Sequence, residues 1–256
     1  MNDGFISAIR YERDSRKSLL RELTWRDLEP LTSRDKPKRM PPEKLPEIIL
    51  AFPKIQDMKY VFLILGFIIG SFSGRAQFAP QAGLPGSTAM HKDSSAFVDW
   101  ASNCTVKRGW MNITDTTLGK VTAGNPGKAF GKADADIVSL GDAGEAVFFF
   151  ENPIINGNGY DFAVFENGFL NPLDSNLAYL ELAKIEVSND GIIYYPFAAV
   201  CENDTTAQIA GVGEYMDARK LNNLAGKYVA GYGTPFDLDE LSLQSGLDVN
   251  DIHYIK

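Results

Sequence analysis

Ala146-Val147-Phe148-Phe149-Phe150 and Asp161-Phe162-Ala163-Val164-Phe165-Glu166 are two short apolar runs, and Asn156-Gly157-Asn158-Gly159 stands between them. The first run is too short for a helix and is long enough for a strand buried on both faces. Asn and Gly tolerate a positive φ and therefore favour a turn. The sequence predicts two strands joined by a turn, the second of which ends at Asn167-Gly168.

Short strands and turns continue toward the C-terminus. Residues 183–188 alternate apolar and polar side chains, which indicates a strand with one face in solvent. Asn189-Asp190-Gly191 then leads into a second apolar run at 192–197, and an Asp-Gly pair between two such runs predicts a hairpin. These elements predict an all-β protein.

Two further elements complete the C-terminal part. A capping hydroxyl at Thr234, followed by Pro235 and acidic residues, is typical of the start of a helix of one or two turns. Residues 252–256 resemble the beginning of a last strand. We therefore expect a β-sandwich over 77–256 that is incomplete at its C-terminal end.

The most apolar stretch of the chain, 61–72, predicts the cellular compartment. Its length of about a dozen residues falls within the ~7–15 of a signal-peptide core and is below the ~20 of a membrane-spanning helix. Small residues at Gly74 and Ala76 suit cleavage before Gln77. We expect 58–76 to be a signal peptide of an exported, cell-surface or extracellular protein. The alternative is a single membrane span, with membrane contact through 58–76 alone.

Residues 1–57 precede this segment and carry mixed charge, several prolines and no sustained apolar period. This composition favours a disordered extension, or one that lies upstream of a true start at Met58.

The expected folded part is strongly acidic. Residues 77–256 hold 11 Lys and Arg against 23 Asp and Glu, a net charge of −12. Nucleic-acid binding depends on basic side chains that displace counterions from phosphates, so a nucleic-acid partner is not expected.

Seven phrases, in order, carry a resemblance to a known family: Trp100-Ala101 with Arg108-Gly109, Val138-Ser139-Leu140-Gly141-Asp142, Pro153-Ile154-Ile155-Asn156-Gly157, Asp161 to Gly168, Glu181-Leu182-Ala183 with Glu186-Val187-Ser188, Asn223 to Tyr228, and Gly231 to Leu238. From about Trp100 onward the chain resembles the secreted "cell surface protein" family of Bacteroidetes and related bacteria. The resemblance implies an extracellular jelly-roll-like β-sandwich, often followed by a sorting domain. Family members continue with a further strand and an Asp- and Gly-rich segment, which this sequence lacks.

Oxygen-bearing side chains gather around the second apolar run. Such groups at strand ends are ligands that Ca²⁺ prefers, and the candidate set is Asp161, Glu166, Asn167 and Asp237. A structural calcium ion would lock the loops that carry them. The alternative is that Asp161 and Asn167 form turns and Asp237 caps a helix.

Exposed aromatic rings stack on sugars, and the candidates for ligand binding are Tyr194, Tyr195 and Tyr232. Their alternative role is to pack the core. His91 and His253 are the only histidines, and no known catalytic motif surrounds either of them or either cysteine. Cys104 and Cys201 would form a disulfide in an oxidising compartment and would otherwise remain thiols.

These features favour a non-catalytic surface module that binds a glycan or another surface ligand. A glycoside hydrolase with two close carboxylates is one alternative. A purely structural adhesin component without a pocket is the other.

Overall fold

The computed structural model describes residues 7–11, 77–134, 136–204 and 214–256. Within these ranges the chain is all-β, as predicted: it consists of antiparallel strands and short 3-10 helices and has no α-helix. None of its described helices is long and apolar enough to span a membrane. The segment expected to be a signal peptide, 58–76, and most of the extension before it lie outside the described residues.

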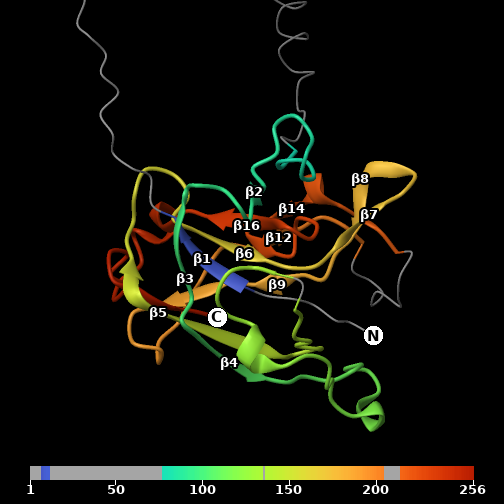
Figure 1. The fold of residues 1–256 in the computed structure, drawn as a ribbon, viewed down its shortest axis with the longest axis horizontal. Helices are drawn as coiled ribbons and strands as arrows, with labels where there is room; N and C mark the ends of the chain where they lie inside the picture. Colours follow the sequence, from blue (N-terminus) through green and yellow to red (C-terminus); the bar gives the residue numbers. More distant parts are fainter. Residues whose placement is uncertain (1–6, 12–76, 135, 205–213) are drawn as a thin grey trace, which may run out of the picture. The chain divides into compact units, whose positions relative to one another are not determined.

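Two five-stranded antiparallel sheets form the body of the fold (Figure 1). Sheet A has the order β2 (Met90–His91), β16 (Tyr232–Phe236), β6 (Phe162–Phe165), β1 (Ser7–Tyr11) and β3 (Phe97–Trp100). Sheet B has the order β11 (Tyr195–Pro196), β10 (Glu186–Ser188), β17 (Ile252–Ile255), β5 (Glu145–Ile154) and β4 (Asn103–Lys107).

Smaller sheets and single turns of helix fill the connections. The strands pair as β12 (Val200–Cys201) with β14 (Leu221–Asn222), β9 (Ala183–Lys184) with β15 (Leu224–Ala225), and β8 (Asp174–Tyr179) with both β7 (Phe169–Asn171) and β13 (Met216–Asp217). The 3-10 helices are η1 (Thr116–Leu118), η2 (Pro126–Lys128), η3 (Ala218–Lys220) and η4 (Leu238–Leu241).

The main hydrophobic core takes side chains from both five-stranded sheets. Phe162 and Val164 of β6 belong to the same buried cluster as Phe148 and Phe150 of β5 and Ile255 of β17. Burying such side chains is the dominant favourable term in folding, so the two sheets stabilise each other through this shared core.

Strand β6 is buried on both faces, because successive side chains of a strand point to opposite sides. Phe162 and Val164 face the main core, whereas Ala163 and Phe165 join a second cluster with Phe97 and Trp100. The prediction of burial on both faces fits β6 better than β5. In β5, Phe149 is half-buried and contacts Tyr254 on the neighbouring strand β17, with the ring centroids 5.2 Å apart.

The hairpin predicted at Asn189-Asp190-Gly191 is confirmed, since β10 and β11 pair directly across it. The Asp190 carboxylate accepts hydrogen bonds from the amides of Ile192 and Ile193 at 2.8 and 3.0 Å, and Gly191 has a φ of 73°. The second strand is shorter than predicted because these contacts hold residues 192–193 in the turn.

The helix predicted to start at Thr234 begins later. Thr234 and Pro235 belong to β16, and Asp237 caps η4 by accepting a hydrogen bond from the Asp239 amide. Pairing with β6 outweighs the local helix signal at Thr234. Pro235 is tolerated because β2 pairs only with Tyr232 and Gly233, which leaves the other side of β16 open at this point.

One strand comes from the extension for which the sequence predicts disorder. Residues 7–11 form β1, which lies between β6 and β3 and pairs antiparallel with both. Residues 12–57 of that extension are outside the described part of the chain.

Candidate binding cavity

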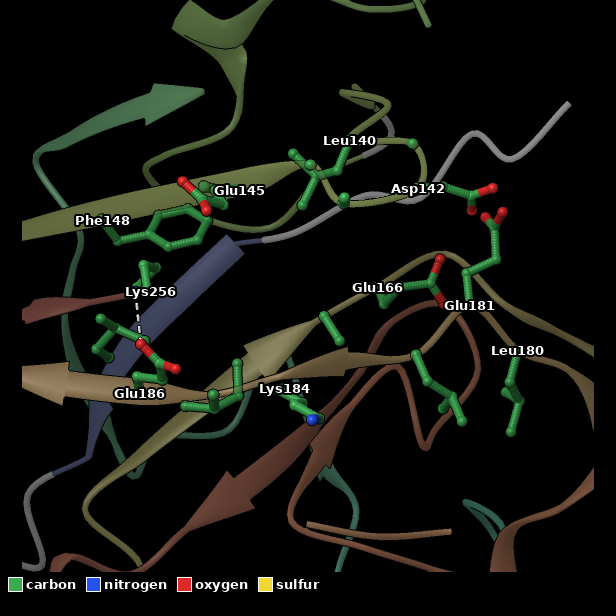
Figure 2. A pocket seen from close by; sticks show the side chains of 18 of the residues that line it. Leu140, Asp142, Glu145, Phe148, Glu166, Leu180, Glu181, Lys184, Glu186 and Lys256 are labelled. Carbon is green, nitrogen blue, oxygen red and sulfur yellow. Dashed lines mark ion pairs between the residues drawn. The ribbon is translucent and has the colours of Figure 1, made fainter. Parts of the chain in front are cut away.

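A cavity of about 680 Å³ is lined by strands of sheet B, by the connections beside them and by Glu166, which follows β6 of sheet A (Figure 2). The loop before β5 and the start of β5 form one wall, and the segment 179–186, which leads into β9 and β10, forms another. Glu166, directly after β6, and Lys256, directly after β17, complete the lining. Strand ends thus converge on the cavity from separate parts of the chain.

Three carboxylates gather on one side of the cavity. Figure 2 shows Glu166, Glu181 and Asp142 with their acidic groups near one another. Glu166 is the most buried of them, with 3% of its surface exposed, and its Oε2 accepts a hydrogen bond from the Gly168 amide at 2.8 Å. This bond fixes the carboxylate at the end of β6.

Gly226 allows the chain to pass close to these carboxylates. It has a φ of +78°, and a Cβ there would lie 2.0 Å from the Glu181 carbonyl oxygen and 3.5 Å from Glu166 Cγ. A side chain at this position would collide with the backbone of the cavity wall.

The opposite side of the cavity carries an ion pair. Lys256 Nζ lies 2.5 Å from Glu186 Oε2, and the two residues also exchange backbone hydrogen bonds of 2.8 Å. The same ammonium group lies 4.4 Å from the centre of the Tyr194 ring. Lys256 is therefore held between a carboxylate and an aromatic face.

The cavity is predominantly acidic with apolar walls. Its charged lining consists of five acidic and two basic side chains, namely Asp142, Glu145, Glu166, Glu181, Glu186, Lys184 and Lys256. Apolar surface comes from residues such as Leu140, Phe148, Leu180 and Ile255. The excess of carboxylates favours ligands that donate hydrogen bonds or carry positive charge and disfavours anions.

The candidate calcium ligands do not form one site. Asp161 precedes β6 and Glu166 follows it, which separates their Cα atoms by roughly 16 Å at the rise of an extended strand. Calcium binds its ligands at ~2.3–2.6 Å, so a single ion cannot reach both. Within the described ranges, no group of three acidic, histidine or cysteine side chains is arranged to hold a metal ion.

Asp161 has a structural role at its own end of β6. Its two carboxylate oxygens accept hydrogen bonds from the amides of Gly157 and Leu238, each at 2.7 Å. Burial raises the pKa of Asp161 to about 6, and these amide donors only partly oppose the effect. The side chain thereby ties the loop before β6 to η4.

The three candidate tyrosines are divided between the two sheets. Tyr194 and Tyr195 lie at β11, the edge strand of sheet B, and Tyr194 reaches the cavity through Lys256. Tyr232 belongs to β16 of sheet A, where its ring makes an edge contact with His91 and packs against a separate apolar cluster. Of the three, Tyr194 is thus the one connected to the cavity.

The two cysteines are free thiols, which is the alternative to the disulfide considered from the sequence. Cys104 of β4 is buried in the main core, while Cys201 of β12 packs against another cluster. Burial raises the pKa of Cys104 to about 12.

The sequence prediction missed most of the cavity. Glu166 is one of the candidate calcium ligands predicted from the sequence, but no sequence pattern indicates Glu181, Glu186 or Lys256 as binding residues. Glu186 belongs to the alternation at 183–188, which predicts a strand and not a ligand site, and Glu181 and Lys256 lie outside that alternation.

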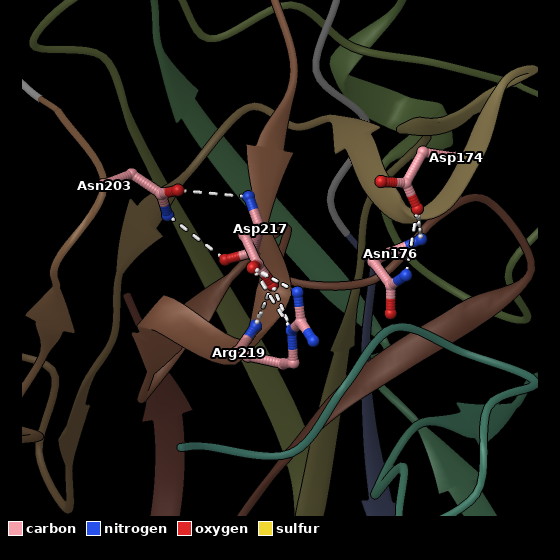
Figure 3. A network of polar contacts seen from close by, with 5 residues as sticks. All are labelled: Asp174, Asn176, Asn203, Asp217 and Arg219. Carbon is pink, nitrogen blue, oxygen red and sulfur yellow. Dashed lines mark hydrogen bonds and ion pairs between the residues drawn. The ribbon is translucent and has the colours of Figure 1, made fainter. Parts of the chain in front are cut away.

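A second cluster of polar side chains surrounds Asp217 (Figure 3). Asp217 follows Met216, which lines the cavity. Asp217 caps η3 and accepts hydrogen bonds from the Arg219 guanidinium at 2.8 to 3.2 Å. Asn203 bonds to both the amide and the carbonyl of Asp217, at 3.0 and 3.2 Å. The cluster holds β13 against the segment that follows β12.

Compared with protein-family models, curated proteins and solved structures, the chain matches none of them.

Proposed function

We propose that residues 77–256 form a non-catalytic, exported cell-surface module, a jelly-roll-like β-sandwich that binds a glycan in the cavity beside Glu166. The observation that carries the proposal is the cavity itself, because it combines acidic hydrogen-bond acceptors with apolar walls. A purely structural adhesin component would need no such cavity.

The lining suits a sugar that carries no negative charge. Carboxylates accept hydrogen bonds from hydroxyl groups, and apolar side chains cover the C–H faces of a sugar ring. The three carboxylates around Glu181 would repel uronic acids and sulfated sugars. We expect neutral sugars or amino sugars to bind and acidic sugars to be excluded.

A glycoside hydrolase is the second candidate, favoured by the presence of Glu166 and Glu181 in one cavity. That chemistry needs one carboxylic acid of raised pKa beside a second carboxylate. The sugar titration distinguishes the two candidates, because only a hydrolase releases shortened sugars.

Contacts near Gln77 support a folded domain that starts at the expected cleavage position. The Phe78 amide donates to the Arg219 carbonyl at 3.1 Å, and the fully buried Gln81 side chain bonds to Lys227 and Val229. Residues that follow Gln77 directly are thus built into the domain. Export with cleavage is the proposal, and a single membrane span at 58–76 is its alternative.

Glycan binding is tested by titrating neutral, amino and uronic-acid oligosaccharides into the protein, with isothermal calorimetry as the readout. We expect binding of the first two classes and a loss of at least tenfold in Glu181→Gln. Glu151→Gln, an exposed carboxylate outside the cavity, is the matched control. Release of shortened sugars during the titration would support the hydrolase, and no binding of any class would refute the glycan proposal.

Export is tested by N-terminal sequencing of protein recovered from fractions of an expressing bacterium. A start at Gln77 outside the inner membrane supports the proposal, whereas a start at Met1 in the membrane fraction supports the single span. Calcium remains a prediction from the sequence, and a rise in melting temperature with calcium that is reversed by a chelator would support it.

A further inference from the structure

Strand β3 is joined to sheet A through β1. Among the described strands, β3 pairs with β1 and with no other, while β1 also pairs with β6. Ile9 lies opposite Trp100 on one side and Ala163 on the other. Residues 7–11 therefore fill a gap one strand wide between β3 and β6.

The gap is kept open by contacts that do not involve β1. Trp100 and Phe97 of β3 pack on Phe165 of β6, with ring centroids 5.6 and 5.7 Å apart. Asp99 of β3 accepts a hydrogen bond from the Asn152 side chain of β5 at 3.3 Å. Both edges of the gap are thus positioned by side chains of sheets A and B.

An empty gap between β3 and β6 would destabilise the domain. All four residues of β6 are at most 1% exposed with β1 in place, and removal of β1 would leave one edge of this buried strand without partners. Unpaired backbone groups in a buried strand cost free energy, and an open edge readily pairs with another extended chain.

Whether the domain loses β1 depends on the sequence that connects the two. The expected signal peptide, 58–76, lies between Tyr11 and Gln77. If it is cleaved, the exported domain loses β1 and keeps both edges of the gap.

We propose that the gap between β3 and β6 is a strand-addition site, which in the exported domain receives an extended segment of a second polypeptide. The inference rests on the export part of the proposed function. Strand addition of this kind draws its affinity from main-chain hydrogen bonds and its specificity from alternate side chains.

The register defines the chemistry of the incoming strand. It runs antiparallel to both neighbours and spans at least the positions of residues 7–10, which lie opposite β6. The place of Ala8 lies opposite Val164, whose side chain is in the main core, and requires a small apolar residue. The place of Arg10 lies between Asp99 of β3 and the buried Phe162 of β6, so it suits a long side chain with an apolar stem beside the ring and a basic end beside the carboxylate.

The test uses the full chain with a recognition sequence for a site-specific protease inserted after Lys38. After cleavage of this chain, a fluorescein-labelled peptide of residues 4–13 is titrated in. We expect saturable binding by fluorescence anisotropy with displacement of the N-terminal fragment. The same peptide with Ile9→Pro lacks the amide at the centre of the ladder and should bind at least tenfold more weakly.

Amide hydrogen exchange provides the second measurement, because it reports on the gap directly. We expect the amides of residues 162–165 to be protected with the peptide bound and to exchange at least tenfold faster without it. The strand-addition site is refuted if both peptides bind equally, if neither replaces the fragment, or if residues 162–165 remain protected without any strand. Export is measured separately by the N-terminal sequence, so export without peptide binding refutes this inference alone, and peptide binding without export refutes the export proposal.

Discussion

The Lys227 ammonium group lies 5.4 Å from the centre of the Tyr228 ring and 6.0 Å from that of Phe78. Lys227 is only 4% exposed, and burial lowers its pKa to about 8. The aromatic faces attract the cation, but they replace only part of its hydration. A positive charge at this position is thus a cost to the folded state.

Replacement of this charge should stabilise the protein. Because the folded pKa of Lys227 lies below the unfolded value of ~10.4, the cost is present at pH 7 and falls as the pH rises from 8 toward 10. We expect Lys227→Met to raise the free energy of unfolding at pH 7 by up to about 3 kcal/mol and to remove this pH dependence. Urea unfolding at pH 7 and 9.5 measures both effects, with the exposed Lys220→Met as control. A less stable Lys227→Met protein would show that the amine is stabilising.

At acidic pH, Asp161 should make the stability of the fold depend on pH in the opposite direction. Its folded pKa of about 6 exceeds the unfolded value of ~3.9, so the folded state holds the proton more tightly. Stability should therefore fall by roughly 2 kcal/mol as the pH rises from 4 to 6 and should then level off. Carbon-13 NMR of the carboxyl groups measures the titration directly. Asp190, whose pKa is lowered by hydrogen bonds from the amides of Ile193 and Ile192, is the internal control. Titration of Asp161 below pH 4 would contradict the prediction.

Sequence patterns predicted the elements that depend on interactions between residues close together in the chain. The all-β class and the hairpin at Asn189-Asp190-Gly191 follow from short apolar runs and turn chemistry, and both are present. The sequence predicts a helix start at Thr234, whereas the helix is capped by Asp237. Both side chains can cap a helix, and only the pairing of β16 with β6 places Thr234 in a strand. Choices of this kind depend on tertiary contacts.

The cavity and the strand between β3 and β6 could not be predicted for the same reason. Glu166, Glu186 and Lys256 line one cavity because the ends of β6 and β17 and the start of β10 converge on it, and sheet order leaves no periodic signal in the sequence. Residues 7–11 carry no turn signal or apolar run that links them to β6, which is far away along the chain.

The Asp217 side chain should contribute more to the free energy of unfolding than an exposed acidic side chain does. Its side chain is 14% exposed, caps η3 and pairs with Arg219 through two oxygens. We expect Asp217→Ala to lower the free energy of unfolding by about 1–2 kcal/mol, measured in urea. Asp217→Asn keeps a capping oxygen and loses the charge, so it should recover about half of this loss. Equal stability of all three proteins would show that the cluster in Figure 3 contributes nothing.

The two thiols should differ in reactivity. Burial raises the pKa of Cys104 to about 12, so almost no thiolate forms at neutral pH, whereas Cys201 is half-buried. We expect iodoacetamide to modify Cys201 in the folded protein at pH 8 and to modify Cys104 only after unfolding, as followed by intact mass. Protein from the bacterial surface that takes up no reagent after unfolding, until a reductant is added, would instead contain the disulfide.

Gly226 connects the stability of the fold to the shape of the cavity. A Cβ at this glycine would lie 2.0 Å from the backbone carbonyl oxygen of Glu181, and the φ of +78° is itself unfavourable for alanine. Since backbone atoms cannot move aside cheaply, Gly226→Ala should lower the free energy of unfolding by roughly 2 kcal/mol or more and displace Glu181 from the cavity. Gly231→Ala is the matched control, because its φ of +84° is similar and no atom lies within 4 Å of a Cβ there. The difference between the two variants in urea unfolding isolates the collision from the backbone cost, and sugar titration of Gly226→Ala at a temperature where it is folded measures the effect on the cavity. Equal stability of the two variants would show that the chain at Gly226 can retreat from Glu181 without cost.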